Sequence, residues 1–485
     1  MPTKKPIENN IQLITLFEEI SADLETPISV YLKLKGIYPS FLLESVEGGE
    51  RLARYSFIGI RPSSQYIIRG QKIQTIKNGS STFYDFPQND DPTQFLQNLM
   101  SSIICQPVSG LPRFIGGLVG YLGFESVRFF EPSLASHVNH SELPDAVYMM
   151  ADTIIAFDHA RGSLFLIINV AENEIESGKQ KLKEIKNRLQ SPIAQVPFKP
   201  QKTSSTKSNN SREDFENIVN RAKEYIFSGD IFQVVLSQRF YRKTVVDAFE
   251  VYRAVRRLNP SPYMYFFDFG EINSQPLFVV GASPEMFVRL EGRTAALNPI
   301  AGTARRDPDP VVDARISEDL LNDPKERAEH VMLVDLGRND LGRVCEYGSI
   351  KVPEFLTIEK YSHVMHIVSH VEGTLRPDLT AFDLVRACFP AGTVSGAPKV
   401  RAVEIISELE KDGRGVYAGM IGYFGFGGNM DTCLAIRTMV GVGNTFSVQG
   451  GAGIVADSSS TKEYQETVNK AMAMLTAIDM AENNI

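Results

Sequence analysis

The stretch SREDFENIVNRAKEYIFSGDIFQVVLSQRFYR, residues 211–242, joins a helix pattern directly to a strand pattern. Apolar residues recur at helical spacing from Phe215 to Ile226, and Ser211 is a suitable N-cap for this helix. The apolar run 231–242 then has the composition of a β-strand. Strand and helix patterns continue to the C-terminus without the regular alternation of a doubly wound sheet. We therefore expect an α+β fold with large mixed or antiparallel sheets packed with helices.

A polar segment, PFKPQKTSSTKSNNS at 197–211, precedes this stretch. It lacks the apolar surface that would offset its ordering entropy, so we predict a linker between an N-terminal domain, 1–196, and a C-terminal domain, 212–485. A charged helix pattern at 177–190 closes the N-terminal part. Short apolar runs separated by turn signals predict strands in that part, at 56–60, 66–70, 114–124, 153–157 and 164–170.

Composition excludes several classes of protein. The 485 residues carry a net charge of −8, which argues against non-specific binding to nucleic acid. No apolar run approaches the roughly 20 residues that span a bilayer, and the N-terminus has no secretory signal. Four scattered cysteines without a CxxC pair fit a reducing compartment. We expect a cytoplasmic protein that binds neither nucleic acid nor a membrane.

Two predicted helices each begin with a pair of glutamates. Glu326 and Glu329 are three residues apart, as are Glu463 and Glu466, so each pair shares one helix face. Residues suited to capping precede them: Asp323 in one helix, and Ser460 or Thr461 in the other. One such pair alone is explained by the helix dipole, which favours acidic residues in the first turn. If the two helices meet, four carboxylates would need a cation, and oxygen ligands suit Mg2+.

Glycine-rich turns could bind anions through backbone N–H groups, although ordinary tight turns explain them equally well. None has the spacing of a P-loop or of a dinucleotide-binding fingerprint. The turns are PIAGTARR at 299–306, FPAGTVSGAPK at 389–399 and QGGAGIVADS at 449–458.

These motifs, taken together and in order, carry a resemblance. The sequence resembles the chorismate-utilising enzymes, and among them the large subunits of anthranilate synthases. The motifs are LLES at 42–45, NPSPYM at 259–264, PIAGT at 299–303, KERAEHVMLVDLGRNDLGR at 325–343, FPAGTVSGAPK at 389–399 and QGGAGIVADS at 449–458.

The resemblance implies the chorismate-utilising enzyme fold and a lyase that converts chorismate and ammonia to anthranilate and pyruvate. This reaction is the first committed step of tryptophan biosynthesis. The sequence contains no glutaminase segment with a nucleophilic cysteine, so the resemblance implies that a separate glutamine amidotransferase small subunit supplies the ammonia. We therefore expect a hetero-oligomer that L-tryptophan inhibits by an allosteric feedback mechanism.

The resemblance also assigns roles to individual residues. Glu285 matches the family's general acid at the departing C4 hydroxyl, and His366 and Thr393 match residues that assist the chemistry. The implied Mg2+ ligands are Glu326, Glu329, Glu463 and Glu466. The implied substrate contacts are Gly302, Thr303, Tyr417, Arg437, Gly451, Ala452 and Gly453.

LLES and NPSPYM match a tryptophan pocket that the family forms between its domains. NPSPYM alone could be a structural proline-rich turn, but the two motifs together favour feedback control. The implied regulatory residues are Leu43, Glu44, Ser45, Pro262, Tyr263 and Met264.

Three related functions are alternatives. Aminodeoxychorismate synthases resemble this chain but carry a lysine nucleophile within PIKGT, where Ala301 stands here. Isochorismate and salicylate synthases carry a lysine that activates water at the position of Gln233, which is no base. A catalytically silent, amino-acid-sensing subunit is the third alternative, and the four glutamates together with His366 argue against it.

Overall fold

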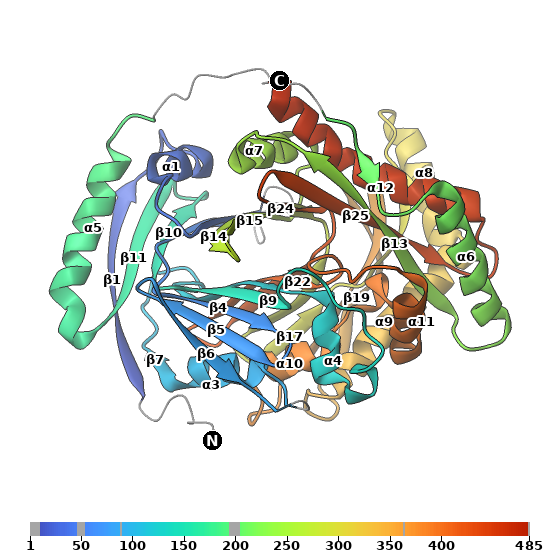
Figure 1. Cartoon of the computed structure of the whole chain (residues 1–485), viewed down its shortest axis with the longest axis horizontal. Helices are drawn as coiled ribbons and strands as arrows, with labels where there is room; N and C mark the ends of the chain where they lie inside the picture. The colour runs from blue at the N-terminus through green and yellow to red at the C-terminus, as the bar shows by residue number, and fades with distance from the viewer. Residues whose placement is uncertain (1–9, 46–53, 88–89, 194–203, 362–363, 484–485) are drawn as a thin grey trace.

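Two large β-sheets pack face to face, and helices cover their outer faces (Figure 1). The computed structural model describes residues 10–45, 54–87, 90–193, 204–361 and 364–483. Apart from the parallel pair β1–β7, the strand pairs in these ranges are antiparallel, so the predicted α+β fold with mixed or antiparallel sheets is confirmed.

The first sheet contains 13 strands in the described part of the chain. Its order is β12 (Lys207–Ser208), β13 (Gln233–Lys243), β25 (Thr445–Ile454), β24 (Thr438–Val442), β15 (Gln275–Ser283), β14 (Tyr263–Ile272), β2 (Ser40–Glu44), β3 (Tyr55–Ile60), β10 (Thr153–Asp158), β11 (Ser163–Ala171), β1 (Ile11–Ser21) and β7 (Ile103–Cys105), with β21 (Gly396–Ala397) also paired to β13.

The second sheet contains 12 strands within the described residues. Its order is β18 (Ile300–Arg305), β20 (Val364–Thr374), β17 (Thr294–Leu297), β16 (Met286–Glu291), β23 (Met430–Leu434), β22 (Met420–Gly425), β8 (Gly117–Leu122), β9 (Ala146–Ala151), β4 (Ser64–Arg69), β5 (Lys72–Lys77) and β6 (Ser80–Asp85), with β19 (Lys351–Lys360) also paired to β20.

Each sheet takes strands from both sides of the predicted linker. In the first sheet β2 pairs with β14, and in the second β8 pairs with β22. The boundary at 197–211 is therefore not a boundary between sheets, and the two-domain division stays a prediction. Residues 194–203 lie outside the described part of the chain, whereas Lys207–Ser208, within the predicted linker, forms β12.

Strands in the middle of the molecule are buried on both faces. In β14, Tyr265 and Phe267 point into the core between the sheets, whereas Met264 and Phe266 pack under the helices. Both sets of residues are apolar, so such strands appear in the sequence as continuous apolar runs without polar alternation. Strands in which nearly every residue is apolar therefore predict a sheet that is covered on both sides.

Helices form the outer layers. Figure 1 shows α5 against β1 and β11, and α12 and α7 over the opposite end of the same sheet. The helices on the first sheet are α1 (Pro27–Leu34), α5 (Ile175–Leu189), α7 (Ala248–Leu258) and α12 (Ser460–Asn483). Those packed around the second sheet and the end of β13 are α3 (Thr93–Ser102), α4 (Val127–Phe130), α6 (Arg212–Phe227), α8 (Pro310–Asn322), α9 (Pro324–Gly342), α10 (Ala381–Cys388) and α11 (Lys399–Leu409).

Several local predictions are confirmed. Ser211 caps α6 by accepting a hydrogen bond from the backbone N–H of Asp214, and Asp323 caps α9. The predicted helix at 177–190 is α5, and the five predicted N-terminal strands are β3, β4, β8, β10 and β11. The start of α12 was misplaced, because the helix already includes Ser460 and Thr461, which therefore do not cap it.

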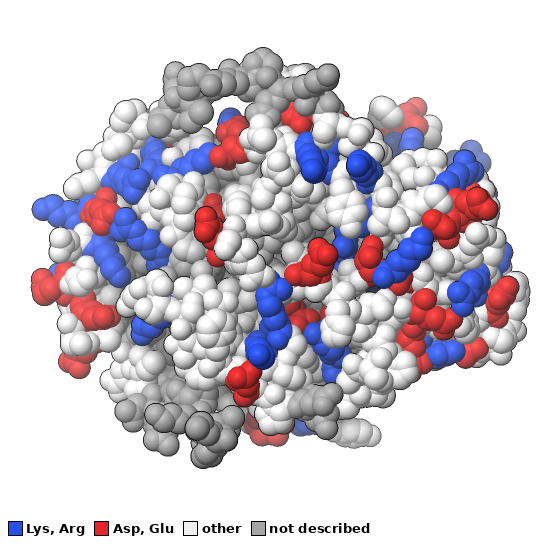
Figure 2. Space-filling model, in the orientation of Figure 1, with Lys and Arg blue, Asp and Glu red and all other residues white. Residues whose placement is uncertain are grey.

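The surface agrees with the sequence composition. On the face drawn in Figure 2, basic and acidic side chains are interspersed, and neither forms a large patch of one charge. No helix of the described residues is long and apolar enough to cross a membrane.

The pairing of β8 with β22 generates a prediction about stability. Gly120 faces Gly422 across this ladder, and a Cβ atom on Gly120 would lie 1.9 Å from the carbonyl oxygen of Val147 in β9. Gly120→Ala must therefore push β8 away from β9, and we expect it to lower the free energy of unfolding by about 1–3 kcal/mol. Urea unfolding followed by circular dichroism measures the change.

The matched control is Gly427→Ala, because a Cβ atom there meets nothing within 4 Å. This control should unfold at nearly the midpoint of the parent protein. Equal midpoints for the Gly120 and Gly427 variants would contradict the close approach.

Candidate active site

One cavity gathers most of the residues that the sequence resemblance assigned to catalysis. It is lined from both sheets and from α9 and α12. The assigned residues that line it are Glu285, Gly302, Thr303, Glu329, His366, Thr393, Tyr417, Arg437, Gly451, Gly453 and Glu466. Glu326, Ala452 and Glu463 do not line it, and the side chain of Ala452 is buried in the core on the other face of β25.

Glu285 has the properties of a proton donor. It lies between β15 and β16, where the backbone N–H of Leu434 donates to its carbonyl oxygen over 3.0 Å. The hydroxyl of Thr393 donates to Glu285 Oε1 over 2.8 Å. Burial raises the pKa of Glu285 to about 7, while the hydrogen bond from Thr393 and the charge of Lys470 act to lower it. A carboxyl with this pKa keeps its proton up to neutral pH and can then release it.

His366, on β20, is held in one orientation. Its Nδ1 lies 3.1 Å from the carbonyl oxygen of Gly302 and 3.0 Å from Oγ1 of Thr303. A carbonyl oxygen can only accept, so Nδ1 carries the proton in this bond and Nε2 keeps its unshared electron pair. Burial lowers the pKa of His366, which favours the neutral ring. The side chain is therefore suited to accept a proton at Nε2.

Arg437 supplies a positive charge to the cavity. Among the described residues its guanidinium has no hydrogen-bond or ion-pair partner, and burial lowers its pKa. A half-buried guanidinium that faces a cavity is well suited to bind a carboxylate through two parallel hydrogen bonds.

The part of the wall formed by β25 requires glycine. A Cβ atom on Gly451 would lie 2.4 Å from the hydroxyl oxygen of Tyr417, so any larger residue would displace that ring. The wall leaves the Tyr417 hydroxyl and the backbone of β25 open to a ligand.

The two glutamate pairs approach the same cavity, as the sequence could not show. Glu329 of α9 and Glu466 of α12 both line it. The starts of the two helices are tied together, because Lys325 Nζ lies 3.0 Å from a carboxylate oxygen of Asp457, which shortly precedes α12. Burial raises the pKa of Glu326 and of Glu463, and the second glutamate of each pair raises it further. This excess of negative charge suits a bound cation.

The carboxylates do not converge on one point. Within the described ranges, no group of three or more His, Cys, Asp or Glu side chains is arranged to hold a metal ion. Glu466 Oε1 lies 2.6 Å from Lys470 Nζ, and Gln233 Nε2 donates to Glu329 Oε1 over 3.2 Å. The donor set therefore fits Mg2+ in its chemistry, and binding would require both carboxylates to exchange these contacts.

Sequence reasoning missed Lys470. Its ammonium group lines the cavity and donates to the carbonyl oxygen of Gly451 over 2.9 Å. Its position four residues after Glu466 on a helix was a usable signal. The structure also places Ala301 and Gln233, which separate the alternative functions, on the cavity wall.

A second cavity contains the residues assigned to regulation. All six assigned residues line it: Leu43, Glu44, Ser45, Pro262, Tyr263 and Met264. It lies where β2 pairs with β14, and it shares no lining residue with the first cavity. The two motifs are thus neighbours in space although they are distant in sequence.

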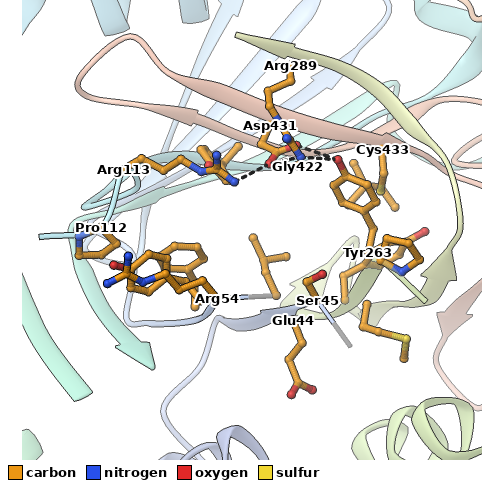
Figure 3. Close-up of a pocket in the computed structure, with 18 of the residues that line it drawn as sticks. Glu44, Ser45, Arg54, Pro112, Arg113, Tyr263, Arg289, Gly422, Asp431 and Cys433 are labelled. Carbon is orange, nitrogen blue, oxygen red and sulfur yellow. Dashed lines mark hydrogen bonds and ion pairs between the residues drawn. The ribbon is translucent and has the colours of Figure 1, made fainter. Parts of the chain in front are cut away.

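The Glu44 carboxylate points away from this second cavity (Figure 3). It accepts hydrogen bonds from the Tyr252 hydroxyl at 2.5 Å and from Arg256 Nε at 3.1 Å. Glu44 therefore anchors β2 to α7, and its side chain is not available to a ligand in the cavity.

The side of the second cavity opposite β2 is a charged network that sequence reasoning missed. Tyr263 donates to Asp431 over 3.1 Å and accepts from Arg289 over 3.0 Å (Figure 3). Arg289 and Arg113 both pair with Asp431, at 3.1 and 3.5 Å. Arg113, Arg289 and Asp431 come from three separate parts of the chain, which explains why no sequence motif revealed them.

Comparison with known proteins reveals relatives along nearly the whole chain. Residues 38–476 match the chorismate binding enzyme family. The chain is 45% identical to anthranilate synthase component 1 from Aquifex aeolicus, over 99% of this chain and 97% of that protein. It is 44% identical to anthranilate synthase component 1 from Pseudomonas aeruginosa, over 97% of this chain and 96% of that protein.

Solved structures agree with these matches. The crystal structure of anthranilate synthase component I from Streptococcus pneumoniae matches with a TM-score of 0.76 and 36% identity, over 94% of this chain and 99% of that chain. The menaquinone-specific isochorismate synthase from Escherichia coli shares the fold, with a TM-score of 0.73 and 18% identity, over 98% of this chain and 96% of that chain. The resemblance drawn from the sequence motifs and the fold that it implied are confirmed.

The raised pKa of Glu285 generates a prediction about stability that does not depend on catalysis. In the unfolded chain the carboxyl ionises near 4.5, whereas in the folded protein it holds its proton to about 7. The contribution of Glu285 to stability is therefore complete below pH 4.5 and is lost as the pH rises through about 7.

The side chain introduced by Glu285→Gln cannot ionise. The free energy of unfolding of this variant should therefore increase relative to that of the parent protein as the pH rises across this window. We expect a relative gain on the order of 2–3 kcal/mol by pH 8. Urea unfolding of both proteins from pH 5 to pH 8.5 measures it. A difference that stays constant with pH would mean that Glu285 ionises as it does in the unfolded chain.

Proposed function

The chain belongs to the chorismate-binding enzyme family, and from this premise we propose that it is the chorismate-converting component of an anthranilate synthase. The reaction joins chorismate and ammonia to give anthranilate, pyruvate and water. The observation that carries the proposal is the hydrogen-bonded pair of Glu285 and Thr393, which lies in one cavity with Arg437 and His366.

Binding of chorismate uses its two carboxylates. Arg437 and the backbone N–H groups at Gly451 and Gly453 are suited to bind the enolpyruvyl carboxylate. The ring carboxylate then faces the glutamates of α9 and α12. This orientation directs the C4 hydroxyl toward Glu285.

The chemistry follows in two steps. Ammonia attacks C2 while Glu285 protonates the C4 hydroxyl, which leaves as water, and the ring double bonds shift to give aminodeoxyisochorismate. His366 Nε2 then accepts the C2 proton as the C3–O bond breaks, and the released enolate of pyruvate takes up one proton from water to become pyruvate. A pKa of about 7 leaves a large fraction of Glu285 protonated at neutral pH, whereas a carboxyl with an ordinary pKa would be almost fully ionised there.

Mg2+ is the proposed cofactor. The residues that would hold it are Glu326, Glu329, Glu463 and Glu466, of which Glu329 and Glu466 line the cavity. When bound, Mg2+ supplies a positive charge that draws electron density toward the ring carboxylate. The glutamates otherwise orient this end of the substrate only poorly, because like charges repel.

The residues at two wall positions support ammonia as the nucleophile. Ala301 offers no amine, and the Gln233 amide cannot deprotonate water. Lys470 does have an amine, but its nitrogen is engaged by the Glu466 carboxylate and by the carbonyl oxygen of Gly451. Aminodeoxychorismate synthesis and isochorismate synthesis are therefore less well supported.

A partner subunit and an inhibitor complete the proposal. The relatives are named component 1, which supports a separate glutamine amidotransferase subunit as the source of ammonia in a hetero-oligomer. The second cavity supports L-tryptophan as a feedback inhibitor, because Tyr263 and Met264 can pack against an indole ring. Arg54 and Arg113 also line this cavity, but they are already paired with Asp158 and Asp431, so the carboxylate of an amino acid would have to share them.

Turnover by the purified chain tests the proposed reaction. With chorismate, Mg2+ and ammonium at alkaline pH, we expect anthranilate, measured by its fluorescence and identified by chromatography. Glutamine in place of ammonium should give no product, and EDTA should abolish the reaction. A 4-amino product, or isochorismate as the main product, would overturn the assignment.

Inhibition by tryptophan tests the second cavity. Ser45 lines this cavity, and its hydroxyl can bond a charged group of the ligand. Loss of such a bond costs about 1.5–3 kcal/mol, so Ser45→Ala should raise the tryptophan inhibition constant ~10- to 100-fold. Titration of tryptophan at fixed chorismate measures this.

The matched control is Ser447→Ala, because Ser447 of β25 lines neither cavity. It should keep the inhibition constant of the parent protein. If Ser45→Ala is inhibited as strongly as the control, the regulatory site lies elsewhere.

A further inference from the structure

A buried ion pair lies directly behind the wall of the first cavity. Arg414 and Glu410 have side chains only 1% and 5% exposed. The guanidinium holds the carboxylate with two hydrogen bonds, of 2.6 Å from Nη2 and 2.8 Å from Nε. Such a pair costs desolvation energy on both partners, so it is weak support for stability by itself.

Besides Glu410, the Arg414 guanidinium contacts three residues that line the cavity and the ring of Phe124, which does not line it and lies 4.6 Å away. Nη1 donates to the carbonyl oxygen of Val394 over 2.8 Å, and Nη2 donates to that of Val235 over 2.7 Å. The guanidinium also lies 5.7 Å from the ring centre of Tyr417, within the range of a cation–π contact. Val235, Val394 and Tyr417 are cavity-lining residues.

Glu410 extends the same network to a further part of the wall. It accepts hydrogen bonds of 2.8 Å from the backbone N–H and from the hydroxyl of Ser237. That hydroxyl in turn accepts a 2.8 Å hydrogen bond from Gln449 Nε2, and Gln449 lines the cavity on β25. One ion pair therefore ties together four separate segments of the wall.

We propose that Arg414, held by Glu410, is a positioning residue that fixes the short 3-10 helix η4 (Gly392–Val394) so that the Thr393 hydroxyl stays on Glu285. Val394 follows Thr393 directly, so a shift of its carbonyl oxygen moves the threonine. A hydrogen bond of 2.8 Å weakens steeply with distance and angle, so a small shift breaks it. The inference rests on the proposed function, in which Glu285 is the acid.

The planar fork of arginine is what this role requires. Lysine keeps the charge but offers one nitrogen, which cannot bind the Glu410 carboxylate and both carbonyl oxygens with the same geometry. Arg414→Lys therefore loosens η4 without removing the buried charge. This substitution alters none of the three residues Thr393, Glu285 and Lys470.

A matched control exists on β13. Arg242 is also buried, with a side chain 5% exposed, and it pairs with Asp479 and Glu482 of α12. None of these three residues lines the cavity. Arg242→Lys thus disturbs a buried arginine fork of the same kind that has no contact with the acid.

Steady-state kinetics with chorismate and ammonium provide the first readout. Arg414→Lys should lower kcat ~10- to 100-fold and leave KM within about 3-fold, as expected when a catalytic group is misplaced. Arg242→Lys should lose stability and keep kcat within about 2-fold. Equal kcat in the two variants would overturn the proposal. If Arg414→Lys does not fold, Glu410→Gln replaces it, and the same direction of change is expected.

A double-mutant cycle separates positioning from a general structural role. In a Thr393→Val background there is no hydroxyl to place, so adding Arg414→Lys should lower kcat by less than about 3-fold. If each substitution lowers kcat by the same factor whether or not the other is present, the proposal is contradicted.

A third readout needs no turnover, so it separates this inference from the proposed function. The Thr393 hydrogen bond lowers the pKa of Glu285, so its loss in Arg414→Lys should move that pKa upward. The test adds Arg414→Lys to the parent protein and to the Glu285→Gln variant and compares their free energies of unfolding. The pH window in which the Glu285→Gln protein becomes more stable relative to its parent should then lie at higher pH. An unmoved window would overturn the positioning role even if anthranilate is formed, and a moved window would support it even if anthranilate is absent.

Discussion

Two antiparallel ladders, β2 with β14 and β8 with β22, join the first and second halves of the chain. Every buried backbone N–H and C=O group needs a partner, and these ladders supply the partners in the middle of both sheets. The β2–β14 register sets Glu44 opposite Met264, which is why the two motifs assigned to regulation form one cavity. The second cavity is therefore a product of the junction and belongs to neither half alone.

The ladder between β14 and β15 brings the two cavities into structural contact. Tyr263 of the second cavity pairs with Ser283 across β14 and β15, and Ser283 exchanges hydrogen bonds with the backbone of Glu285. Coupling between two sites requires an element whose arrangement both of them influence. The β14–β15 pair touches both cavities, and so it meets the geometric part of this requirement.

Local features could be predicted from the sequence, whereas long-range pairing could not. Spacing placed Glu326 and Glu329 on one helix face, and the cap at Ser211 was visible because capping depends on near neighbours. The roles of Glu285 and Arg437 came from the resemblance alone. The inward and outward alternation that buries Ala452, and the anchoring of Glu44 by α7, depend on partners far along the chain. Arg414 gave no signal of its role, since the two backbone carbonyl oxygens that it binds belong to other segments of the chain.

The shared sheets also shape how the chain is made. β2 and β8 leave the ribosome long before β14 and β22 exist, so in the nascent chain each has one ladder edge without its native partner. Open edges next to unburied aromatic residues template intermolecular pairing. The first half of this protein thus exposes two strand edges that become paired only when its second half has been synthesised.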